Sequence, residues 1–305
     1  MNLSEDLKFS LVKQIKDFLK TADKPAILAI VGPIGSGKTT FSIQIAKQIS
    51  GEIINADSKQ LYRGLEVTNG CISESEKHSI PHYLFSEVDP SQNFTVVQHR
   101  QAALSIIKKI HQRQHIPILV GGTGLFVQSL LENFNIPENS VDPLLRKKLE
   151  QKNKSELWQE LQRVDPEYAK TTHENNQVRV IRALEVFYLT GQKKSYAQKK
   201  EKVFSELILL PKIENREKLY ALINNRALKI WKNGLLEEAQ QLLSRNLNEN
   251  LPALKTIGIP EAFAFLRKEI SEEEAILQMQ KKSRNYAKRQ MTWWRKQKNV
   301  VYWNI

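Results

Sequence analysis

The sequence predicts an α/β fold, in which a parallel sheet core carries helices on both faces and an all-helical domain is inserted. Short apolar runs alternate with amphipathic helical segments over the first third of the 305-residue chain. A glycine-rich loop directly follows the first apolar run, and strand patterns are absent from residues 135–200 before returning near residue 206. Because parallel strands require crossover helices, this alternation favours a sheet that is covered on both faces.

The elements of the predicted core follow one another in order. We expect strands over residues 26–31, 52–55, 116–120, 206–210 and 300–303, with helices over residues 39–49, 96–112 and 217–232. An added amphipathic helix is expected near the N-terminus, where Leu11, Ile15 and Phe18 recur at helical spacing. Ligands of such sheets bind at the carboxyl ends of the strands, which here precede three loops, at residues 32–39, 56–60 and 121–124.

The inserted domain is predicted from helix start and stop signals. Asp142-Pro143 and Asp165-Pro166 each place a capping side chain before a proline at the first helical position, and Gly191 can end the last helix. We expect helices over residues 143–151, 155–163 and 176–189. The predicted domains are therefore a core of residues 1–134 and 203–305 and a helical insertion of residues 135–202.

The loop at residues 32–39 carries the phosphate-loop pattern Gly-x-x-x-x-Gly-Lys-Thr between a predicted strand and a predicted helix. Its glycines let backbone amides point at an anion, and the helix N-terminus adds partial positive charge. Lys38 is expected to reach a phosphate oxygen, and Thr39 to hold a Mg²⁺ ion. We predict a phosphate or pyrophosphate site formed by Gly32, Gly35, Ser36, Gly37, Lys38, Thr39 and Thr40.

Three further residues are candidates for chemistry. Asp57 closes the second predicted strand, where a carboxylate can accept a proton, cap a helix or support a metal ion. Thr123 follows the third strand and can donate to a phosphate or a base edge, although a typical phosphate-loop ATPase carries an acid near this place. Arg226 falls on the apolar stripe of its helix, so an anionic substrate or an internal acid such as Asp57 must pair it.

Charge is distributed unevenly along the chain. The net charge is +13, of which residues 1–150 carry +2 and residues 151–305 carry +11. Eight basic residues follow Glu274 without another acid, which favours a polyanion such as nucleic acid over a solvated basic face. Arg179 and Arg182 lie one helical turn apart and can contact successive phosphates, or pair with Glu174 or Glu185.

Composition excludes several classes of protein. The sequence contains no run of eighteen apolar residues, so it predicts no membrane span. The first residues lack the apolar core of a signal peptide. A single cysteine, Cys71, excludes an internal disulfide framework and a cysteine metal cluster. We expect a cytoplasmic monomer.

Taken together, segments from about residue 26 to residue 303 resemble the tRNA dimethylallyltransferases, also called tRNA isopentenyltransferases. The resemblance is carried by Gly-Pro-x-x-x-Gly-Lys-Thr at 32–39, Glu-Ile-Ile-Asn-Ala-Asp-Ser at 52–58, Ile-Pro-His at 80–82, Val-Gly-Gly-Thr-Gly-Leu at 120–125, Arg-Val-Ile-Arg-Ala-Leu-Glu-Val at 179–186, Gly-Leu-Leu-Glu-Glu at 234–238 and Tyr-Ala-Lys-Arg-Gln-Met-Thr-Trp at 286–293. The order and spacing of these pieces are together specific, and the chain is most similar to the bacterial form.

The resemblance implies transfer of a dimethylallyl group from its pyrophosphate to the exocyclic amine of the tRNA adenosine just 3′ of the anticodon. The phosphate loop would then hold the pyrophosphate leaving group with Mg²⁺, which explains why no metal-binding acid follows the third strand. Asp57 matches the general base, Thr123 a position near the phosphates and the base, and Arg226 a partner of the pyrophosphate. The implied tRNA contacts are Ser58, Lys59, Gln60, Arg146, Arg179, Arg182, Lys281, Arg284, Lys288 and Arg289, with the insertion holding the anticodon stem-loop.

The chain departs from the family pattern at three places. Ile34-Gly35 replaces the usual Thr-Ala, residues 67–71 replace Gly-Thr-Ala-Lys-Pro, and Ile259-Pro260 replaces an aromatic-lysine pair. Three other functions remain as alternatives: a small-molecule or nucleotide kinase, an adenylate isopentenyltransferase that acts on free nucleotide, and a non-enzymatic RNA-binding protein. The kinase leaves the basic C-terminal half unexplained, and the intact Lys38, Thr39 and Asp57 argue against the last.

Overall fold

The computed structural model describes residues 5–132, 142–196, 202–297 and 300–304. These residues form two compact units, one of Met1–Val127 with Val203–Ile305 and the other of Gln128–Lys202. The predicted boundary between residues 134 and 135 lies outside the described residues. No helix in the described parts of the chain combines the length and the apolar character that crossing a bilayer requires.

The first unit is built on a six-stranded parallel sheet, in the order β3-β2-β4-β1-β5-β6. Its strands are β1 (Ala26–Val31), β2 (Gly51–Asn55), β3 (His82–Tyr83), β4 (Ile116–Gly121), β5 (Ser205–Lys212) and β6 (Val300–Asn304). The register pairs Val31 with Gly121 and Asn55 with Val120, so β1, β2 and β4 end at one edge. The predicted α/β fold with a parallel sheet is confirmed.

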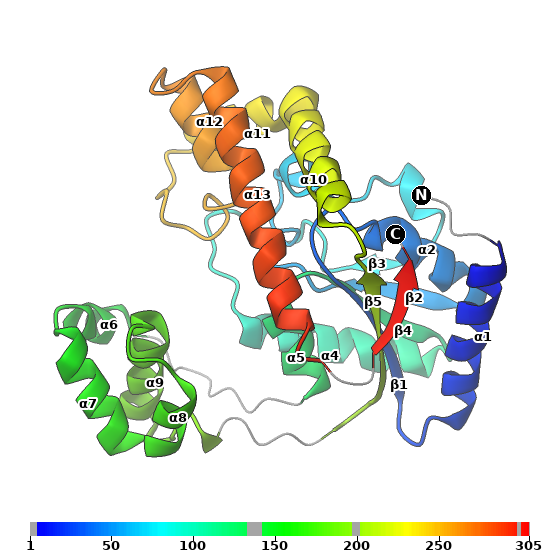
Figure 1. Cartoon of the computed structure of the whole chain (residues 1–305), viewed down its shortest axis with the longest axis horizontal. Coiled ribbons are helices and arrows are strands. Elements are labelled where there is room, and N and C mark those ends of the chain that lie inside the picture. The colour runs from blue at the N-terminus through cyan, green and yellow to red at the C-terminus, as the bar shows by residue number, and fades with distance from the viewer. Residues whose placement is uncertain (1–4, 133–141, 197–201, 298–299, 305) are drawn as a thin grey trace. The chain divides into compact units, whose positions relative to one another are not determined.

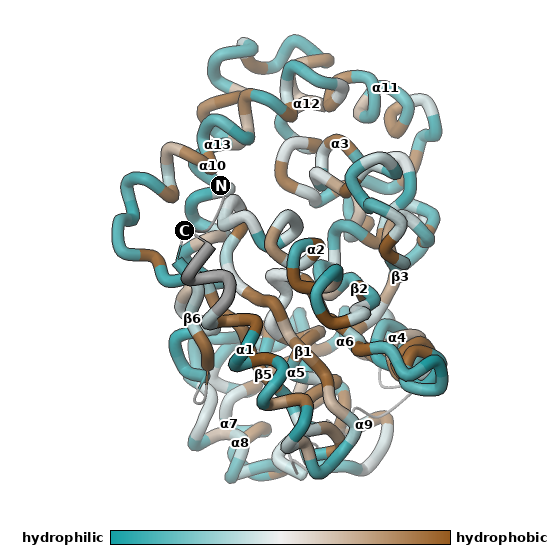
Figure 2. The backbone as a smooth tube through the Cα atoms, turned by 90° about the vertical axis from the view of Figure 1, so that its right-hand side faces the viewer, coloured by the Kyte–Doolittle hydropathy of each residue, from teal (hydrophilic) through white to brown (hydrophobic). Residues whose placement is uncertain are grey.

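Both faces of the sheet are covered. Leu28 and Ile30 of β1 pack in one cluster with residues of α1 (Glu5–Thr21) and α2 (Lys38–Ile49). Leu11 and Ile15, on the apolar stripe of α1, are buried in this cluster. The alternate residues of β1 point to the opposite face and are also fully buried. That face carries α4 (Val96–Gln112), which contacts β4 and buries Ile107 and Ile110. Figure 2 shows the trace of β1 as strongly hydrophobic.

The remaining helices that lie wholly in this unit are α3 (Glu66–Asn69), α10 (Arg216–Ile230), α11 (Leu236–Ser244), α12 (Ile259–Leu266) and α13 (Glu272–Trp294), with the short helical segments η1 (Ser75–Lys77) and η3 (Trp231–Leu235). The helix α5 (Gly124–Leu131) contains the boundary between the residues of the two units. The helices α10 and α13 pack side by side (Figure 1). Gly234, at a φ of +125°, allows the kink through which α10 leads by way of η3 into α11. Glu238 of α11 accepts hydrogen bonds from the Val67 and Thr68 amides and so caps α3.

The second unit contains α6 (Pro143–Glu150), α7 (Lys154–Val164), α8 (Pro166–Thr171) and α9 (Gln177–Thr190). Asp142 and Asp165 accept hydrogen bonds from the first amides of α6 and α8, as their place before a proline predicts. Gly191 ends α9 in the left-handed conformation. Leu157, Leu161 and Leu184 are buried in a core that the second unit forms from its own helices.

Candidate functional site

The phosphate loop joins β1 to α2, and its backbone depends on glycine. Gly35 and Gly37 have φ values of +80° and +77°, which side chains other than glycine rarely adopt. A Cβ atom on Gly32 would lie 2.6 Å from Cδ of Pro211 on β5. The loop is therefore held closely against the sheet. Its left-handed glycines let backbone amides gather at the start of α2, where a helix N-terminus can bind an anion.

Lys38 lies inside this loop. Its Nζ atom donates to the Pro33 carbonyl at 2.7 Å, and the Ser36 hydroxyl donates to the same oxygen at 2.8 Å. Burial lowers the pKa of Lys38 to about 8, while the charge of Asp57 opposes that change and the charge of Arg226 adds to it. The structure thus brings Lys38, Asp57 and Arg226 into electrostatic contact, although they come from three distant parts of the sequence.

Asp57 lies just beyond β2 in a loop that side chains hold in place. The Asp57 amide donates to Oδ1 of Asn55 at 2.8 Å, and Oδ1 of Asp57 accepts the Lys59 amide at 3.0 Å. The Ser58 amide donates to the Thr123 hydroxyl at 3.0 Å, and this hydroxyl donates to Oγ of Ser58 at 3.3 Å. The loops after β2 and β4 are thereby joined, and Thr123 braces the loop that carries Asp57.

Arg226 projects from α10 toward the segment after α3. Its Nη2 atom donates to the Asn69 carbonyl at 2.9 Å, whereas its Nε atom is buried without a hydrogen-bond partner among the described residues. A Cβ atom on Gly70 would lie 2.2 Å from Nη2, so glycine leaves the space that the guanidinium fills. Burial lowers the pKa of Arg226, and Asp57 opposes the change. A buried guanidinium with an unused donor is suited to binding an anion.

One cavity of about 790 Å³ contains the phosphate loop, Asp57 and Arg226. The predicted site residues that line it are Gly35, Gly37, Lys38, Thr39, Thr40, Asp57, Ser58, Lys59, Gln60, Arg226 and Arg289. Gly32, Ser36 and Thr123 are not in its lining, and Ser36 is only 2% exposed. Five of the seven predicted phosphate-loop residues therefore face the same space as the Asp57 loop.

Several cavity residues were not identified from the sequence. Lys229, Lys255, Thr256 and Tyr286 line the cavity, and Lys229 and Lys255 join four predicted cations there. The Thr256 hydroxyl is buried and has no hydrogen-bond partner among the described residues. These residues come from segments far from the phosphate loop in sequence, and of the four only Tyr286 lies in a stretch that carries the family resemblance. The lining is strongly cationic, which suits a ligand of several negative charges.

Lys59 and Gln60 help to build the cavity wall. Nζ of Lys59 donates to the Pro252 carbonyl at 2.6 Å, and Nε2 of Gln60 lies 3.2 Å from the Asn69 carbonyl that Arg226 also contacts. Burial lowers the pKa of Lys59. These contacts connect the Asp57 loop to the segments that follow α3 and precede α12, and the predicted contacts of Lys59 and Gln60 with RNA remain predictions.

The predicted RNA-binding residues on α13 differ in their surroundings. Lys281 and Lys288 are exposed, whereas Nη1 of Arg284 donates to Oδ1 of Asn224 at 2.6 Å. The guanidinium of Arg289 lies 5.6 Å from the ring centre of Tyr286, at the cavity. Basic side chains of α13 therefore extend from the cavity lining to the surface of the first unit.

Two of the three predicted RNA-binding residues of the second unit lie near one buried acid. Arg146 lies 3.7 Å and Arg182 lies 3.4 Å from Glu185, whose side chain is fully buried, and Arg146 also pairs with Glu150 at 3.1 Å. Pairing with Glu185 was one of the two alternatives that the sequence left open for Arg182. Arg179 is exposed.

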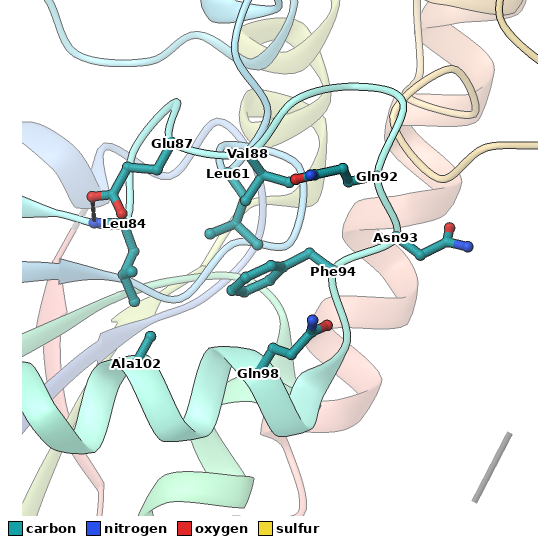
Figure 3. Close-up of a pocket in the computed structure, with 9 residues that line it drawn as sticks. All are labelled: Leu61, Leu84, Glu87, Val88, Gln92, Asn93, Phe94, Gln98 and Ala102. Atoms are coloured by element: carbon teal, nitrogen blue, oxygen red, sulfur yellow. Dashed lines mark hydrogen bonds between the residues drawn. The ribbon is translucent and has the colours of Figure 1, made fainter. Parts of the chain in front are cut away.

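A second cavity of about 550 Å³ lies between the segment after β3 and the start of α4 (Figure 3). Leu84 and Phe94 contribute apolar surface to it, and Gln98 lines it from α4. The carboxylate of Glu87 accepts the Leu84 amide at 2.8 Å. None of the residues predicted for the functional site lines this second cavity, whereas Lys38, Asp57 and Arg226 all line the cationic cavity, which is therefore the candidate site.

The cationic cavity also limits how a metal ion can bind. Within the described residues, no group of three or more His, Cys, Asp and Glu side chains is placed to hold a metal. Thr39 nevertheless lines the cavity together with Asp57. Mg²⁺ is commonly bound through one or two protein ligands with the remaining positions taken by substrate phosphates and water, so this donor set suits a substrate-bound Mg²⁺.

Comparisons with known proteins cover most of the chain. The model of a family described as IPP transferase matches residues 60–297. The tRNA dimethylallyltransferase of Anoxybacillus flavithermus is 38% identical over 281 residues, which cover 92% of this chain and 90% of that protein. The tRNA dimethylallyltransferase of Acetivibrio thermocellus is 40% identical over 284 residues, which cover 91% of this chain and 90% of that protein.

Solved structures match over a similar extent. The full-length tRNA isopentenylpyrophosphate transferase from Bacillus halodurans aligns with a TM-score of 0.69 and 36% identity, covering 92% of this chain and 90% of that chain. A eukaryotic dimethylallyltransferase, solved in snapshots of its action on tRNA, aligns with a TM-score of 0.77 and 28% identity, covering 92% of this chain and 73% of that chain.

Proposed function

The chain belongs to the IPP transferase family, and on that premise we propose that it is a tRNA dimethylallyltransferase. It transfers a dimethylallyl group from dimethylallyl pyrophosphate to the exocyclic amine of the tRNA adenosine just 3′ of the anticodon, and it releases pyrophosphate. The observation that carries this proposal is the single cationic cavity that the phosphate loop, Asp57 and Arg226 share.

Each step of the proposed reaction has a residue suited to it. The adenosine amine attacks the first allylic carbon, the bond between that carbon and the diphosphate oxygen breaks, and the electron pair leaves with pyrophosphate. Asp57 accepts the proton that the amine loses. Lys38 and Arg226 stabilise the negative charge that develops on pyrophosphate, inside a cavity where such interactions are strong. Thr39 would hold a Mg²⁺ ion, which supplies further positive charge to the diphosphate when bound.

The tRNA contacts extend this proposal. Ser58, Lys59 and Gln60 line the cavity beside Asp57, which suits them to contact a base that has left its stack. We assign the phosphate backbone of the anticodon stem-loop to Arg146, Arg179, Arg182, Lys281, Arg284, Lys288 and Arg289. We propose that the protein acts as a monomer. We propose that the enzyme acts in the cytoplasm.

The proposal is tested by incubating the protein with labelled dimethylallyl pyrophosphate, Mg²⁺ and unmodified tRNA that has adenosine at the target position. We expect the label to enter the RNA, and a matched tRNA with guanosine at that position to remain unlabelled. Label that appears in added free AMP and not in the RNA would support a nucleotide prenyltransferase. With labelled ATP, transfer of the γ-phosphoryl group to an acceptor, or its hydrolysis, without prenyl transfer would support a kinase.

Lys38 gives the proposed diphosphate site a pH dependence. The protonated amine binds the anion, so affinity is highest below the pKa of about 8 and is lost as the pH rises through it. Because bound diphosphate raises this pKa, binding at pH 8 should take up a fraction of a proton. Calorimetry in buffers of different ionisation enthalpy measures that uptake. Lys38→Arg, which keeps its charge at pH 8, is the control and should take up less, whereas equal uptake by both proteins would contradict the assignment.

A further inference from the structure

The side chain of Gln290, on α13, reaches the tip of the phosphate loop. Its Oε1 atom accepts the Ile34 amide at 2.8 Å, a hydrogen bond between residues 256 positions apart in the sequence. Gln290 is 4% exposed, so water does not compete freely for this contact. The Ile34 amide is thus held by a side chain of the protein, which fixes the direction in which the loop leaves β1.

The nitrogen of the Gln290 side-chain amide, Nε2, lies against the loop after β4. A Cβ atom on Gly122 would lie 1.9 Å from Nε2 of Gln290 and 3.2 Å from the Gly32 carbonyl. Gly122 therefore leaves the space in which Gln290 lies between the two loops. Any side chain at position 122 would have to displace the end of Gln290.

Tyr286 extends the connection toward Asp57. It lies one helical turn before Gln290 and lines the cavity, where burial and then the charge of Asp57 raise the pKa of its phenol. Thr123, the neighbour of Gly122, accepts the Ser58 amide beside Asp57. Gln290 therefore lies between the phosphate loop and the loop after β4, which Thr123 joins to the loop of the proposed base.

Apolar contacts hold the loop tip against the same helices. Ile34 packs in a cluster with Leu219 and Ile223 of α10 and with Met291 of α13. A Cβ atom on Gly35 would lie 3.0 Å from Cγ1 of Ile223. The chain departs from the family pattern at Ile34-Gly35. There the Ile34 side chain packs against α10 and α13, and the absence of a side chain on Gly35 lets Ile223 of α10 approach the loop closely.

We propose that Gln290 is a positioning residue, which sets the phosphate loop relative to the loop of Asp57 so that the diphosphate and the nucleobase meet in one geometry. Gln290 is absent from the cavity lining, and so it acts through Ile34 and Gly122 without touching the substrate. This inference rests on the proposed dimethylallyl transfer, and it identifies α13 as the element that connects the two halves of the site.

The test compares Gln290→Met with Gln280→Met, because Gln280 lies on the same helix and its Nε2 donates to the Asn224 carbonyl at 3.4 Å. We expect Gln290→Met to raise the KM for dimethylallyl pyrophosphate, and the calorimetric Kd for inorganic pyrophosphate, about tenfold, as loss of a buried hydrogen bond predicts. The KM for tRNA should stay within about twofold, and Gln280→Met should change none of these values. A Gln290→Met variant that matches Gln280→Met, or that raises both KM values equally, overturns the proposal.

Gly122→Ala provides a second variant, which keeps Gln290 but displaces its end. It should raise the same KM and the same pyrophosphate Kd, and the double variant with Gln290→Met should be no worse than the poorer single variant, because both remove one interaction. Fully additive effects would contradict the inference. Failure of the wild-type protein to prenylate tRNA would refute the proposed function, whereas the pyrophosphate Kd values would still decide the role of Gln290.

Discussion

Replacing Asp57 with asparagine is expected to reduce kcat about 10³-fold and to leave the affinity for tRNA within about tenfold of the wild-type value, as expected for loss of a proton acceptor. Asparagine keeps an oxygen that can accept the Lys59 amide, so the loop retains its hydrogen bond at 3.0 Å. The amide cannot take the proton that the attacking amine must lose. Steady-state transfer of labelled prenyl group at saturating substrates measures kcat, and filter binding measures tRNA affinity.

Asp89→Asn is the control for Asp57→Asn. Asp89 also lies in a loop after a strand, but it pairs with Arg245 at 2.7 Å and does not line the cavity. We expect this variant to turn over at the wild-type rate. Loss of tRNA binding together with turnover in Asp57→Asn would make Asp57 a recognition residue and would leave the reaction without an identified base.

Replacing Arg226 with methionine is expected to lower kcat/KM for dimethylallyl pyrophosphate by about 10²- to 10³-fold, because a preorganised cation at the leaving group is lost. Arg226→Lys restores the charge but not the planar fork that reaches the Asn69 carbonyl at 2.9 Å, so it should recover only part of the activity. Steady-state kinetics with varied dimethylallyl pyrophosphate measure the effect.

Arg216→Met is the control for Arg226→Met, because Arg216 begins the same helix and is exposed. Its kcat/KM should match the wild type, and thermal melting should show that Arg226→Met remains folded. A folded Arg226→Met variant with unchanged kcat/KM would show that the guanidinium supports only the packing near Gly70.

The sequence predicted the helices and strands whose apolar residues form a continuous run or recur at regular spacing. The residues predicted for β1 and α4 agree with the structure at both ends, because each element presents an unbroken apolar run or stripe between turn signals. The strand β3 was not predicted, since His82–Tyr83 is too short to show alternation. The kink at Asn233–Gly234 also went unpredicted, because it depends on how α10 and α11 pack, and not on a local breaker pattern alone.

The functional site was predictable to the extent that motifs lie at strand ends. Lys38 and Asp57 follow β1 and β2, so topology alone places them at one edge. Arg226 was found because a cation on an apolar stripe requires a partner. Thr256 and Gln290 could not be found in this way, since their position at the site depends on the tertiary placement of segments more than 200 residues after the phosphate loop.

A crystal structure with a non-hydrolysable dimethylallyl thiopyrophosphate and an anticodon stem-loop tests most directly whether the two substrates meet in the cationic cavity. We predict diphosphate oxygens within hydrogen-bond distance of Lys38 and Arg226, and the adenosine amine about 3 Å from the Asp57 carboxylate. An adenosine bound outside this cavity, or a diphosphate that leaves Lys38 bonded only to the Pro33 carbonyl, would contradict the account.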